Sequence, residues 1–355
     1  MEKKKKILFF TPPYCGGAER MTVFIAKMLP PEKFDIKFIV VGPELGEIVK
    51  FIPTDYQIKL IRLRKIWHGG LFRIWNVIRK EKPNIVFGSL LYLNARLILA
   101  ASLYKTKVII RNNIAFSEIQ KRVNSLLIHI TYKWADLVIA QQEEMHDEII
   151  SFTGISPEKV ITLHNPIDTT LIDERTKAPS PYKKSDNSIK YVWTARIDPT
   201  KGQDILLSAF KILHRQLPNT KLYIVGKYIL EDKYYQELKQ YVKDNGLSDC
   251  VMFTGFDDNP YKWVVNADCY VMPSRKEGLP NSLIDAMYLG KPVVATTCIP
   301  VISRIVRDGY NGILVAPEDV EAMAAAMQKA IYLKDFKMTY TPASKEDFIS
   351  LFRDI

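Results

Sequence analysis

The fold is decided by a stretch at residues 269–290, which reads CYVMPSRKEGLPNSLIDAMYLG. It opens with four apolar residues, 269–272, that predict a short buried strand, and it closes in a helical pattern over residues 282–289. A strand that leads through a loop into a helix is one βα unit, and the same unit recurs along the chain. This recurrence predicts an α/β fold built on parallel sheets.

The other strand candidates are also short, rich in β-branched residues and apolar on both faces, as expected of buried parallel strands. They are residues 7–11, 36–41, 85–88, 108–111, 137–140 and 160–163 in the first half, and residues 190–194, 221–225, 251–254, 293–296 and 313–315 in the second half. Helical patterns between them cover residues 18–29, 93–103, 203–215, 231–245 and 320–332. Two sets of six strands predict two doubly wound, Rossmann-like domains, with ligands bound in a cleft beyond the carboxyl ends of the strands.

The domain boundaries follow from changes in this pattern. Residues 1–165 are expected to form the first domain and residues 188–340 the second. Residues 166–187 are rich in Pro and Lys and lose the apolar periodicity, which predicts a linker. Within residues 341–355, three apolar side chains (Phe348, Leu351 and Phe352) recur at helical spacing and predict a final helix.

Composition limits the class of protein. The chain has 355 residues, of which 47% are apolar and 25% charged, so disordered and fibrous proteins are excluded. Its four cysteines form no CxxC pair, which excludes disulfide scaffolds and zinc ribbons and favours a reducing compartment. The apolar-rich residues 83–104 are interrupted by Pro83, Asn84, Asn94 and Arg96, so they predict no membrane-spanning helix. We therefore expect a soluble cytoplasmic protein.

Positive charge is concentrated in the first half. Residues 1–165 contain 25 Lys+Arg and 15 Asp+Glu, whereas residues 166–355 contain 25 and 24. The basic clusters are residues 3–6, Arg62/Arg64/Lys65, Arg79/Lys80/Lys82 and Lys121/Arg122, and four apolar residues (Trp67, Leu71, Phe72 and Trp75) lie beside the second. One interpretation is a solvated basic surface; the other is an anionic membrane surface as partner. Nucleic acid is not expected as a partner, because no recognised binding motif accompanies the charge.

Residues 273–287 also carry the pattern of a ligand site. Pro280 suits the first turn of a helix, and free N–H groups near residues 281–283 would then bind an anion. Glu277 before the helix and Asp285 inside it are placed to accept hydrogen bonds from hydroxyls at the two ends of a ligand with a phosphate in its middle. A nucleotide sugar has this form. The alternative is an acid near the helix start and an ordinary exposed helix acid.

The same stretch resembles the E-x7-E signature of glycosyltransferase family 4, with Asp285 in place of the second Glu. The resemblance covers most of the chain; its further segments are Gly16–Arg20, Ala135-Asp136, residues 165–168, Arg196–Gly202, Val225-Gly226, residues 253–255 and residues 309–312. It implies a retaining enzyme of the GT-B fold, in which two Rossmann-like domains face each other across a cleft. It also implies that the first domain lies on the acceptor side, that the second binds the nucleotide sugar, and that the C-terminal helix returns toward the first domain.

Three residues are assigned to catalysis. Arg196 and Lys201 directly follow a predicted strand; an arginine grips phosphate oxygens with a planar fork, and a lysine acts as a point charge. Both are therefore expected on the diphosphate. The resemblance implies that Glu277 orients hydroxyls of the donor sugar and that Asp285 binds the ribose.

Other donor contacts are expected at Gly16, Gly17, Phe256, Gly278, Leu279, Pro280, Asn281, Ser282 and Leu283. For the glycine pair the alternative is a plain turn before a helix, and for Phe256 it is a core aromatic. The acceptor candidates are Arg111, Asn112 and Asn113, at the carboxyl end of a first-domain strand, with a capped turn as the alternative.

Absent motifs narrow the chemistry. The chain has no Asp-x-Asp, so the metal–diphosphate device of the other large glycosyltransferase fold is missing, and no metal is expected to be required. GxGxxG, GxxxxGK[ST] and GxSxG are also absent, which argues against dinucleotide oxidoreductases, P-loop NTPases and α/β-hydrolases.

The resulting hypothesis is a metal-independent hexosyltransferase of surface-polysaccharide or lipopolysaccharide assembly. It would move a hexose or N-acetylhexosamine from a nucleotide diphosphate, expected to be UDP, to a glycan or polyprenyl-diphosphate-linked glycan, at the inner face of the cytoplasmic membrane. The alternatives are a non-hydrolysing UDP-sugar 2-epimerase and a catalytically silent sugar-nucleotide-binding protein.

Overall fold

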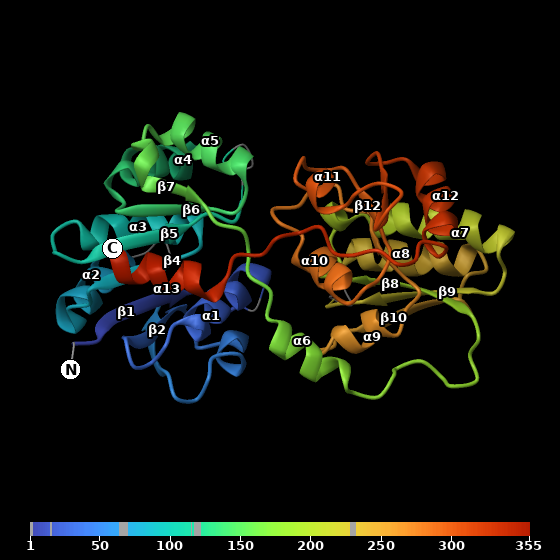
Figure 1. Ribbon diagram of the computed structural model, residues 1–355, viewed down its shortest axis with the longest axis horizontal. Coiled ribbons are helices and arrows are strands. Elements are labelled where there is room, and N and C mark those ends of the chain that lie inside the picture. The colour runs from blue at the N-terminus through green and yellow to red at the C-terminus, as the bar shows by residue number, and fades with distance from the viewer. Residues whose placement is uncertain (1–2, 15, 64–69, 115, 117–121, 228–231) are drawn as a thin grey trace. The chain divides into compact units, whose positions relative to one another are not determined.

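The structure is a computed structural model that describes residues 3–14, 16–63, 70–114, 116, 122–227 and 232–355. The chain divides into two compact units. Unit 1 comprises Met1–Pro166 and Pro342–Ile355, and unit 2 comprises Ile167–Thr341 (Figure 1). Each unit contains one sheet of parallel strands with helices packed against it.

Within the described residues, the sheet of unit 1 has seven parallel strands in the order β3-β2-β1-β4-β5-β6-β7. They are β1 (Lys5–Thr11), β2 (Phe34–Gly42), β3 (Gln57–Arg62), β4 (Ile85–Gly88), β5 (Lys107–Arg111), β6 (Leu137–Ala140) and β7 (Val160–Thr162). The helices are α1 (Gly17–Met28), η1 (Glu47–Lys50), α2 (Gly70–Glu81), α3 (Leu91–Ala101), α4 (Arg122–Thr131), η3 (Tyr132–Trp134), α5 (Glu143–Thr153), η4 (Pro157–Lys159) and α13 (Lys345–Asp354).

The edge strand β3 is the strand that the sequence does not predict. Its residues, QIKLIR, mix polar and apolar side chains, and at the edge of the sheet Ile61 is the buried one of the six. The other strands are recognised by continuous apolar runs, which an edge strand does not need.

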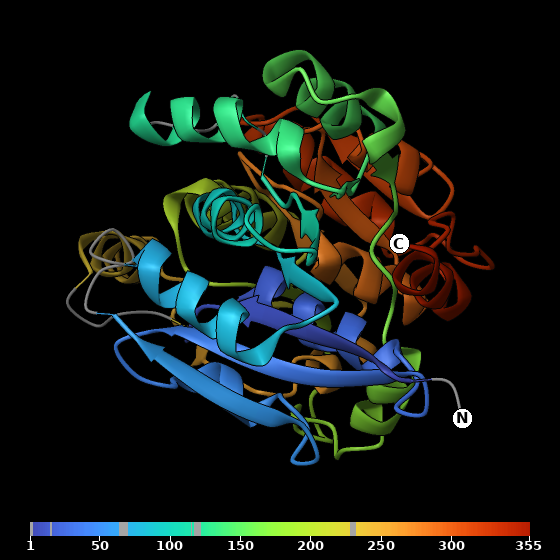
Figure 2. The same ribbon diagram turned by 90° about the vertical axis from the view of Figure 1, so that its left-hand side faces the viewer.

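Both faces of this sheet are covered. Leu8 and Phe10 belong to a hydrophobic cluster shared with α2, α3 and α4, whereas Ile7 and Phe9 belong to a cluster shared with α1 and α13. Neighbouring residues of one strand point to opposite faces, so β1 contributes to both clusters. Figure 2, in which unit 1 faces the viewer, shows helices on both sides of the strands.

The C-terminal helix α13 is part of the core of unit 1. Phe348 and Phe352 are 1% and 0% exposed. The ring of Phe352 lies 5.8 Å from that of Phe9 and 5.7 Å from that of Phe87. Full burial of one such side chain contributes about 1.5–3 kcal/mol, so α13 is held firmly against unit 1.

Within its described residues, unit 2 has a six-stranded parallel sheet in the order β10-β9-β8-β11-β12-β13. The strands are β8 (Ile189–Thr194), β9 (Thr220–Val225), β10 (Val251–Gly255), β11 (Cys269–Met272), β12 (Val293–Thr296) and β13 (Gly312–Val315). The helices are α6 (Thr169–Thr176), η5 (Pro199–Lys201), α7 (Gln203–Gln216), α8 (Lys233–Asp244), α9 (Tyr261–Val265), α10 (Asn281–Tyr288), α11 (Ile302–Ile305) and α12 (Val320–Ala330).

Residues 166–187, predicted as a linker, contain helix α6 and belong to unit 2 from Ile167 onward. Asn259 donates a side-chain hydrogen bond to the carbonyl of Arg175 at 2.9 Å, which holds the end of α6 against its unit. Within α6 the buried residue is Ile172. The apolar periodicity that marks the other helices is therefore weak in this one.

Both strand orders reverse at one point, between β1 and β4 in unit 1 and between β8 and β11 in unit 2. The predicted fold class, two doubly wound parallel-sheet α/β domains, is confirmed. In such sheets the crevice at the carboxyl ends of the two strands flanking the reversal is the usual ligand site.

Candidate active site

The candidate site of unit 2 lies at the reversal point of its sheet. Residues 195–202 follow β8, and residues 273–280 follow β11. The two strands are hydrogen-bonded neighbours, so both loops leave the same edge of the sheet side by side. The predicted donor residues Arg196, Lys201 and Glu277 therefore come from adjacent loops.

Backbone contacts hold these two loops together. The N–H groups of Arg275 and Lys276 donate to the carbonyl oxygen of Thr200 at 2.8 and 3.2 Å. Gly202 has a φ of +68°, and a Cβ built on it would lie 2.1 Å from the carbonyl oxygen of Pro273. Only glycine tolerates both this conformation and this close approach. The main chain thus fixes the position of one loop relative to the other.

An ion pair joins the two loops at their predicted functional residues. Lys201 Nζ lies 2.8 Å from Glu277 Oε1, and the two side chains are 22% and 11% exposed. The hydroxyl of Ser274 donates to the same carboxylate oxygen at 2.7 Å. Because both charges are mostly shielded from water, their interaction is stronger than that of an exposed pair. One small ligand can therefore contact a fixed cation and a fixed carboxylate together.

Arg196 is more exposed than Lys201. Its side chain is 71% exposed and contacts the Asp198 carboxylate at 3.1 Å. Asp198 also accepts hydrogen bonds from the backbone N–H and the hydroxyl of Thr200, at 3.0 and 2.6 Å. Burial raises the pKa of Asp198, but the hydrogen bonds from Thr200 and the charge of Arg196 outweigh it and leave that pKa below its usual value. Asp198 consequently stays ionised, and the guanidinium remains accessible to an anion.

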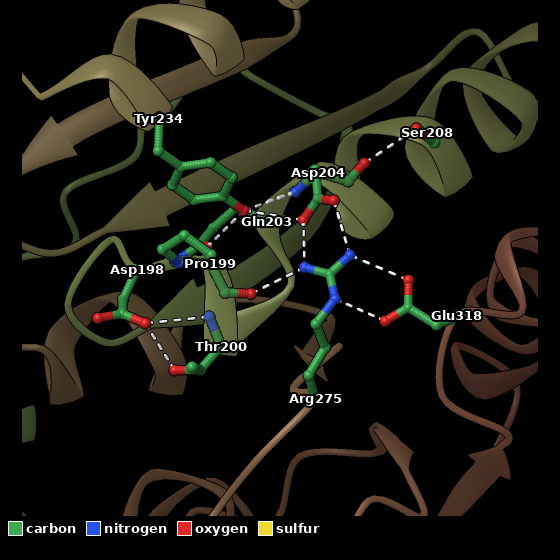
Figure 3. A network of polar contacts seen from close by, with 9 residues as sticks. All are labelled: Asp198, Pro199, Thr200, Gln203, Asp204, Ser208, Tyr234, Arg275 and Glu318. Carbon is green, nitrogen blue, oxygen red and sulfur yellow. Dashed lines mark hydrogen bonds and ion pairs between the residues drawn. The ribbon is translucent and has the colours of Figure 1, made fainter. Parts of the chain in front are cut away.

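Arg275, to which the sequence assigns no role, is the centre of the polar network in Figure 3. Two of its nitrogens donate to the two carboxylate oxygens of Asp204 at 2.8 and 2.7 Å. It binds Glu318 through two further contacts of 2.5 and 3.0 Å, and it donates to the carbonyl of Pro199 at 2.8 Å. One side chain thereby connects the loop after β11, the loop after β8, the start of α7 and the segment before α12.

The charges in this network support one another. Burial raises the pKa of Asp204, but the hydrogen bonds from Arg275 and Tyr234 outweigh it, so the pKa falls below its usual value. Hydrogen bonds to Asp204 and Glu318 raise the pKa of Arg275. The Tyr234 hydroxyl donates to Asp204 at 2.8 Å. The pKa of Tyr234 is raised mainly by burial and further by this hydrogen bond. The network therefore persists across the neutral pH range.

We expect Arg275→Ala to raise the donor KM about tenfold or more, because charge-assisted hydrogen bonds are worth about 1.5–3 kcal/mol each and the loop after β11 loses several of them. Arg275→Lys should restore only part of the affinity, since a lysine cannot form two bidentate contacts. Arg215→Ala, at an exposed position near the end of α7, is the matched control. Donor kinetics and the melting temperature measure the effect; a lower melting temperature with unchanged KM would limit Arg275 to folding.

The start of α10 differs from the prediction. Pro280 is the N-cap, one position before the first helical turn. The N–H of Asn281 donates to the carbonyl of Leu279, and the N–H of Leu283 to that of Pro280, both at 3.0 Å. The prediction of free N–H groups at Asn281 and Leu283 is therefore wrong, because the tight turn folds its own carbonyls over them. The side chains of Leu279 and Leu283 are buried in the core, so neither side chain is exposed for the donor contact that the sequence predicts.

Tyr270 of β11 lies near both acids of the E-x7-E-like pattern. Its hydroxyl donates to that of Ser282 at 2.8 Å. Burial raises the pKa of Tyr270 to about 12, and the negative charges of Glu277 and Asp285 contribute to the shift. Asp285, like Gly278, is partly buried. The sequence does not single out Tyr270, because a tyrosine within a buried strand is indistinguishable from a core residue.

Phe256 follows β10 and is 60% exposed, so the core-aromatic alternative does not apply to it. Gly255 before it has a φ of +80°, and its carbonyl accepts a 2.9 Å hydrogen bond from the N–H of Gly226. A Cβ on Gly226 would lie 1.6 Å from the carbonyl oxygen of Ala195, in the loop after β8. Glycines at both positions thus let the loops after β8, β9 and β10 pack closely.

In unit 1, Gly16 and Gly17 lie exposed at the start of α1, the helix that follows β1. The N–H of Gly16 donates to the Glu19 carboxylate at 3.0 Å, and a Cβ on Gly16 would lie 2.6 Å from Glu19 Oε2. Burial raises the pKa of Glu19. Arg20 lies over the ring of Phe51 at 4.4 Å. Glu19 therefore caps the helix, and Gly16 leaves room for its carboxylate.

The acceptor candidates of unit 1 are largely internal. Arg111 and Asn112 are 2% and 0% exposed. Arg111 donates to the side-chain oxygen of Asn165, and the Asn112 side-chain oxygen accepts from the Tyr132 hydroxyl at 3.1 Å. These contacts fit the alternative of a structural turn. Asn113 is partly buried and remains the acceptor candidate of the three.

The described parts of the chain contain no group of three or more His, Cys, Asp or Glu side chains arranged to hold a metal ion. None of their helices combines the length and apolar character that a membrane crossing requires. Arg196, Lys201 and Arg275 all contribute positive charge at the candidate site of unit 2.

Two doubly wound parallel-sheet units, one of which carries cations beside a carboxylate at the sheet's reversal point, are the architecture of the GT-B fold. A crystal structure of Anabaena HepE in complex with UDP and glucose has this fold: the match covers 99% of this chain and 98% of that one, with a TM-score of 0.76 and 20% sequence identity.

Family models place the chain more narrowly. The model described as Glycosyltransferase Family 4 matches residues 15–171, and the model described as Glycosyl transferases group 1 matches residues 174–347. The chain belongs to glycosyltransferase family 4, and the resemblance seen in its motifs is confirmed.

Two bacterial relatives match most of the chain. One, from Campylobacter jejuni, is named N-acetylgalactosamine-N,N'-diacetylbacillosaminyl-diphospho-undecaprenol 4-alpha-N-acetylgalactosaminyltransferase; it is 27% identical over 96% of this chain and 94% of its own length. The other, from Escherichia coli, is named UDP-Gal:alpha-D-GlcNAc-diphosphoundecaprenol alpha-1,3-galactosyltransferase; it is 23% identical over 89% of this chain and 84% of its own length.

Proposed function

We propose that this glycosyltransferase moves a hexose or N-acetylhexosamine from a UDP-sugar to a hydroxyl of a polyprenyl-diphosphate-linked glycan, in the assembly of a surface polysaccharide or lipopolysaccharide. The names of the Campylobacter and Escherichia relatives support the acceptor class, since both specify an undecaprenol diphosphate. UDP is supported by the name of the Escherichia enzyme and by the ligand of the Anabaena structure.

The observation that carries the proposal is the 2.8 Å contact between Lys201 and Glu277. In a nucleotide sugar the anomeric carbon is joined directly to a phosphate oxygen, so the residues that bind the sugar and the phosphate must adjoin. The ammonium group of Lys201 can pair with a phosphate oxygen, and the carboxylate of Glu277 can accept hydrogen bonds from the sugar hydroxyls. Arg196, exposed on the same loop, extends the cationic site along the diphosphate.

Catalysis would then depend on stabilising the leaving UDP. Negative charge develops on the phosphate oxygen as the glycosidic bond breaks, and a fixed cation stabilises the transition state more than the ground state. Arg196 and Lys201 supply that charge without a metal ion. Glu277 orients the sugar, and its carboxylate also lies near the developing positive charge of the oxocarbenium-like sugar. Asp285 on α10 binds the ribose.

Retention of the anomeric configuration is part of the proposal. The names of both relatives specify α-linkages, and an α-glycoside formed from an α-linked nucleotide sugar requires net retention. The acceptor proton would pass to the departing phosphate oxygen on the same face of the sugar. A lipid-linked acceptor is held in a membrane, which supports our further proposal that the enzyme acts at the inner face of the cytoplasmic membrane as a peripheral protein.

The test is a thermal-shift screen of nucleotide sugars followed by transfer assays in EDTA. A donor at a hundred times its Kd should stabilise the protein by about 2.7 kcal/mol. We expect stabilisation by UDP-sugars and UDP release that requires a polyprenyl-diphosphate-linked acceptor. Conversion of the UDP-sugar without an acceptor would indicate a 2-epimerase, and binding without any turnover would indicate a silent binding protein. Loss of transfer in EDTA would refute metal independence.

A further inference from the structure

Two adjacent pockets lie at the amino-terminal edge of the unit 1 sheet, opposite to the edge at which ligands of such sheets bind. Their volumes are about 700 and 500 Å³, and residues 104–107, at the start of β5, line both. Neither pocket includes a residue assigned to the donor or acceptor. Their location therefore requires a separate explanation.

The pockets are strongly basic. The larger is lined by Lys105, Lys107, Lys133 and Lys159, and the smaller adds Lys5, Arg79 and Lys82. Among the described side chains that line them, Asp136 is the acidic one, and it is engaged by Lys107 at 2.8 Å and by the N–H of Val108 at 2.8 Å. Most of the positive charge is therefore not neutralised locally. Such a surface attracts phosphate oxyanions.

An exposed apolar stripe runs along α4 and η3 to the larger pocket. Leu126, Ile130 and Trp134 are 61%, 42% and 50% exposed, and their spacing of four residues places them on one side of the helix. Trp134 lines the larger pocket, and Lys133 Nζ lies 5.9 Å from the centre of its ring. Leu103, between two lining residues at the end of α3, is 76% exposed.

We propose that this combined region, the α4 surface, docks unit 1 onto a bilayer that contains anionic phospholipid. It is defined by Lys105, Lys133, Lys159, Leu103, Leu126, Ile130 and Trp134. Charge complementarity identifies the partner, because lysines bind lipid phosphates while tryptophan and leucine side chains enter the boundary between headgroups and acyl chains. A soluble anion would need the lysines but would leave the apolar stripe exposed to water.

The sequence offers four basic clusters as a candidate membrane contact, at residues 3–6, 62–65, 79–82 and 121–122, and the apolar residues at 67–75 lie beside the second. Lys5, Arg79 and Lys82 of these clusters line the smaller pocket, whereas the residues that define the α4 surface belong to none of them. Arg64, Lys65, Trp67 and Lys121 lie outside the described residues. Phe72 of α2 is 67% exposed and stacks on Trp75 at 5.4 Å; neither residue lines a pocket, although Trp75 contacts Tyr104, which lines both. The lysines of the α4 surface come from separate connections of the sheet, so no local cluster in the sequence marks them.

Sedimentation with vesicles tests the docking, and it needs no glycosyl transfer. We expect the wild-type protein to sediment with vesicles of equal parts phosphatidylglycerol and phosphatidylcholine at low salt, and not with phosphatidylcholine alone. Lys105→Glu/Lys133→Glu should weaken binding by roughly thirtyfold or more, since each lysine near an anionic surface contributes a factor of about five. Trp134→Ala should weaken the binding that persists at high salt.

Matched variants distinguish the effect of the α4 surface on vesicle binding from the effects of the protein's net charge and of exposed aromatic residues in general. Lys183→Glu/Lys184→Glu in unit 2 makes the same change in charge at exposed positions, and Tyr332→Ser removes an exposed aromatic of the same unit. Both should bind like the wild type. An unchanged circular dichroism spectrum and melting temperature in every variant show that the fold is intact. The proposal would be overturned if the control pair of substitutions in unit 2 lost as much vesicle binding as the pair in unit 1. It would also be overturned if inorganic phosphate displaced the wild-type protein from the vesicles at constant ionic strength.

Discussion

Lys201→Ala is expected to lower kcat for sugar transfer by about 100- to 1000-fold, the loss typical of removing one fixed group that stabilises developing negative charge. Lys201 lies 2.8 Å from Glu277, so the substitution removes the cation nearest to the predicted junction of sugar and phosphate. The donor KM should change less than kcat, because the charge on the leaving oxygen is largest in the transition state. Initial rates at varied donor concentration measure both constants.

A double-mutant cycle with Glu277→Gln tests whether Lys201 and Glu277 act together in catalysis. Glutamine keeps the shape of the side chain but removes its charge, and we expect a large loss of kcat here as well. Because the two residues are in direct contact, the double variant should lose less than the product of the single effects. Lys243→Ala, at an exposed position near the end of α8, is the control. Wild-type turnover by Lys201→Ala would remove the diphosphate assignment.

Gly202→Ala should reduce the free energy of unfolding by about 3 kcal/mol or more, as expected when a substitution forces both backbone strain and a steric overlap. At φ +68° an alanine is strained, and its Cβ would lie 2.1 Å from the Pro273 carbonyl oxygen, which is main chain and cannot rotate away. The overlap would also push the loop of Glu277 away from that of Lys201. Urea unfolding measures the stability, and a weaker thermal shift with UDP should accompany its loss.

The chain contains a matched control for this effect. Gly246 has nearly the same backbone conformation, φ +66°, but none of the described atoms lies within 4 Å of the Cβ that an alanine would add. Gly246→Ala should therefore cost only the backbone strain of the left-handed conformation, about 1–2 kcal/mol. If the two substitutions destabilised the protein equally, the close approach of the two loops would not matter.

The central strands and most of the long helices of the fold are predictable from the sequence, because a buried parallel strand needs a continuous apolar run. The edge strand β3 and the helix α6 are not predictable in this way. Each buries only part of its surface, so its apolar pattern is weak. Their places are determined by neighbouring elements: by β2 for β3, and by α9 for α6.

For the candidate site, motifs indicate which residues matter but not how they meet. Glu277 and Lys201 are both recognisable from the sequence, yet their direct contact depends on β8 and β11 being neighbours. Arg275 lies within the quoted motif, but its partners Asp204 and Glu318 are 71 and 43 residues away in the chain. The internal positions of Arg111 and Asn112 are likewise set by tertiary packing, which the end of a strand does not reveal.

A crystal structure of the protein with UDP tests the central claim most directly. The account predicts that the two phosphates lie within hydrogen-bonding distance of the Arg196 and Lys201 side chains, with the ribose hydroxyls at Asp285. Phosphates bound away from residues 196–201 and 277–285 would contradict it, whatever the transfer assays show.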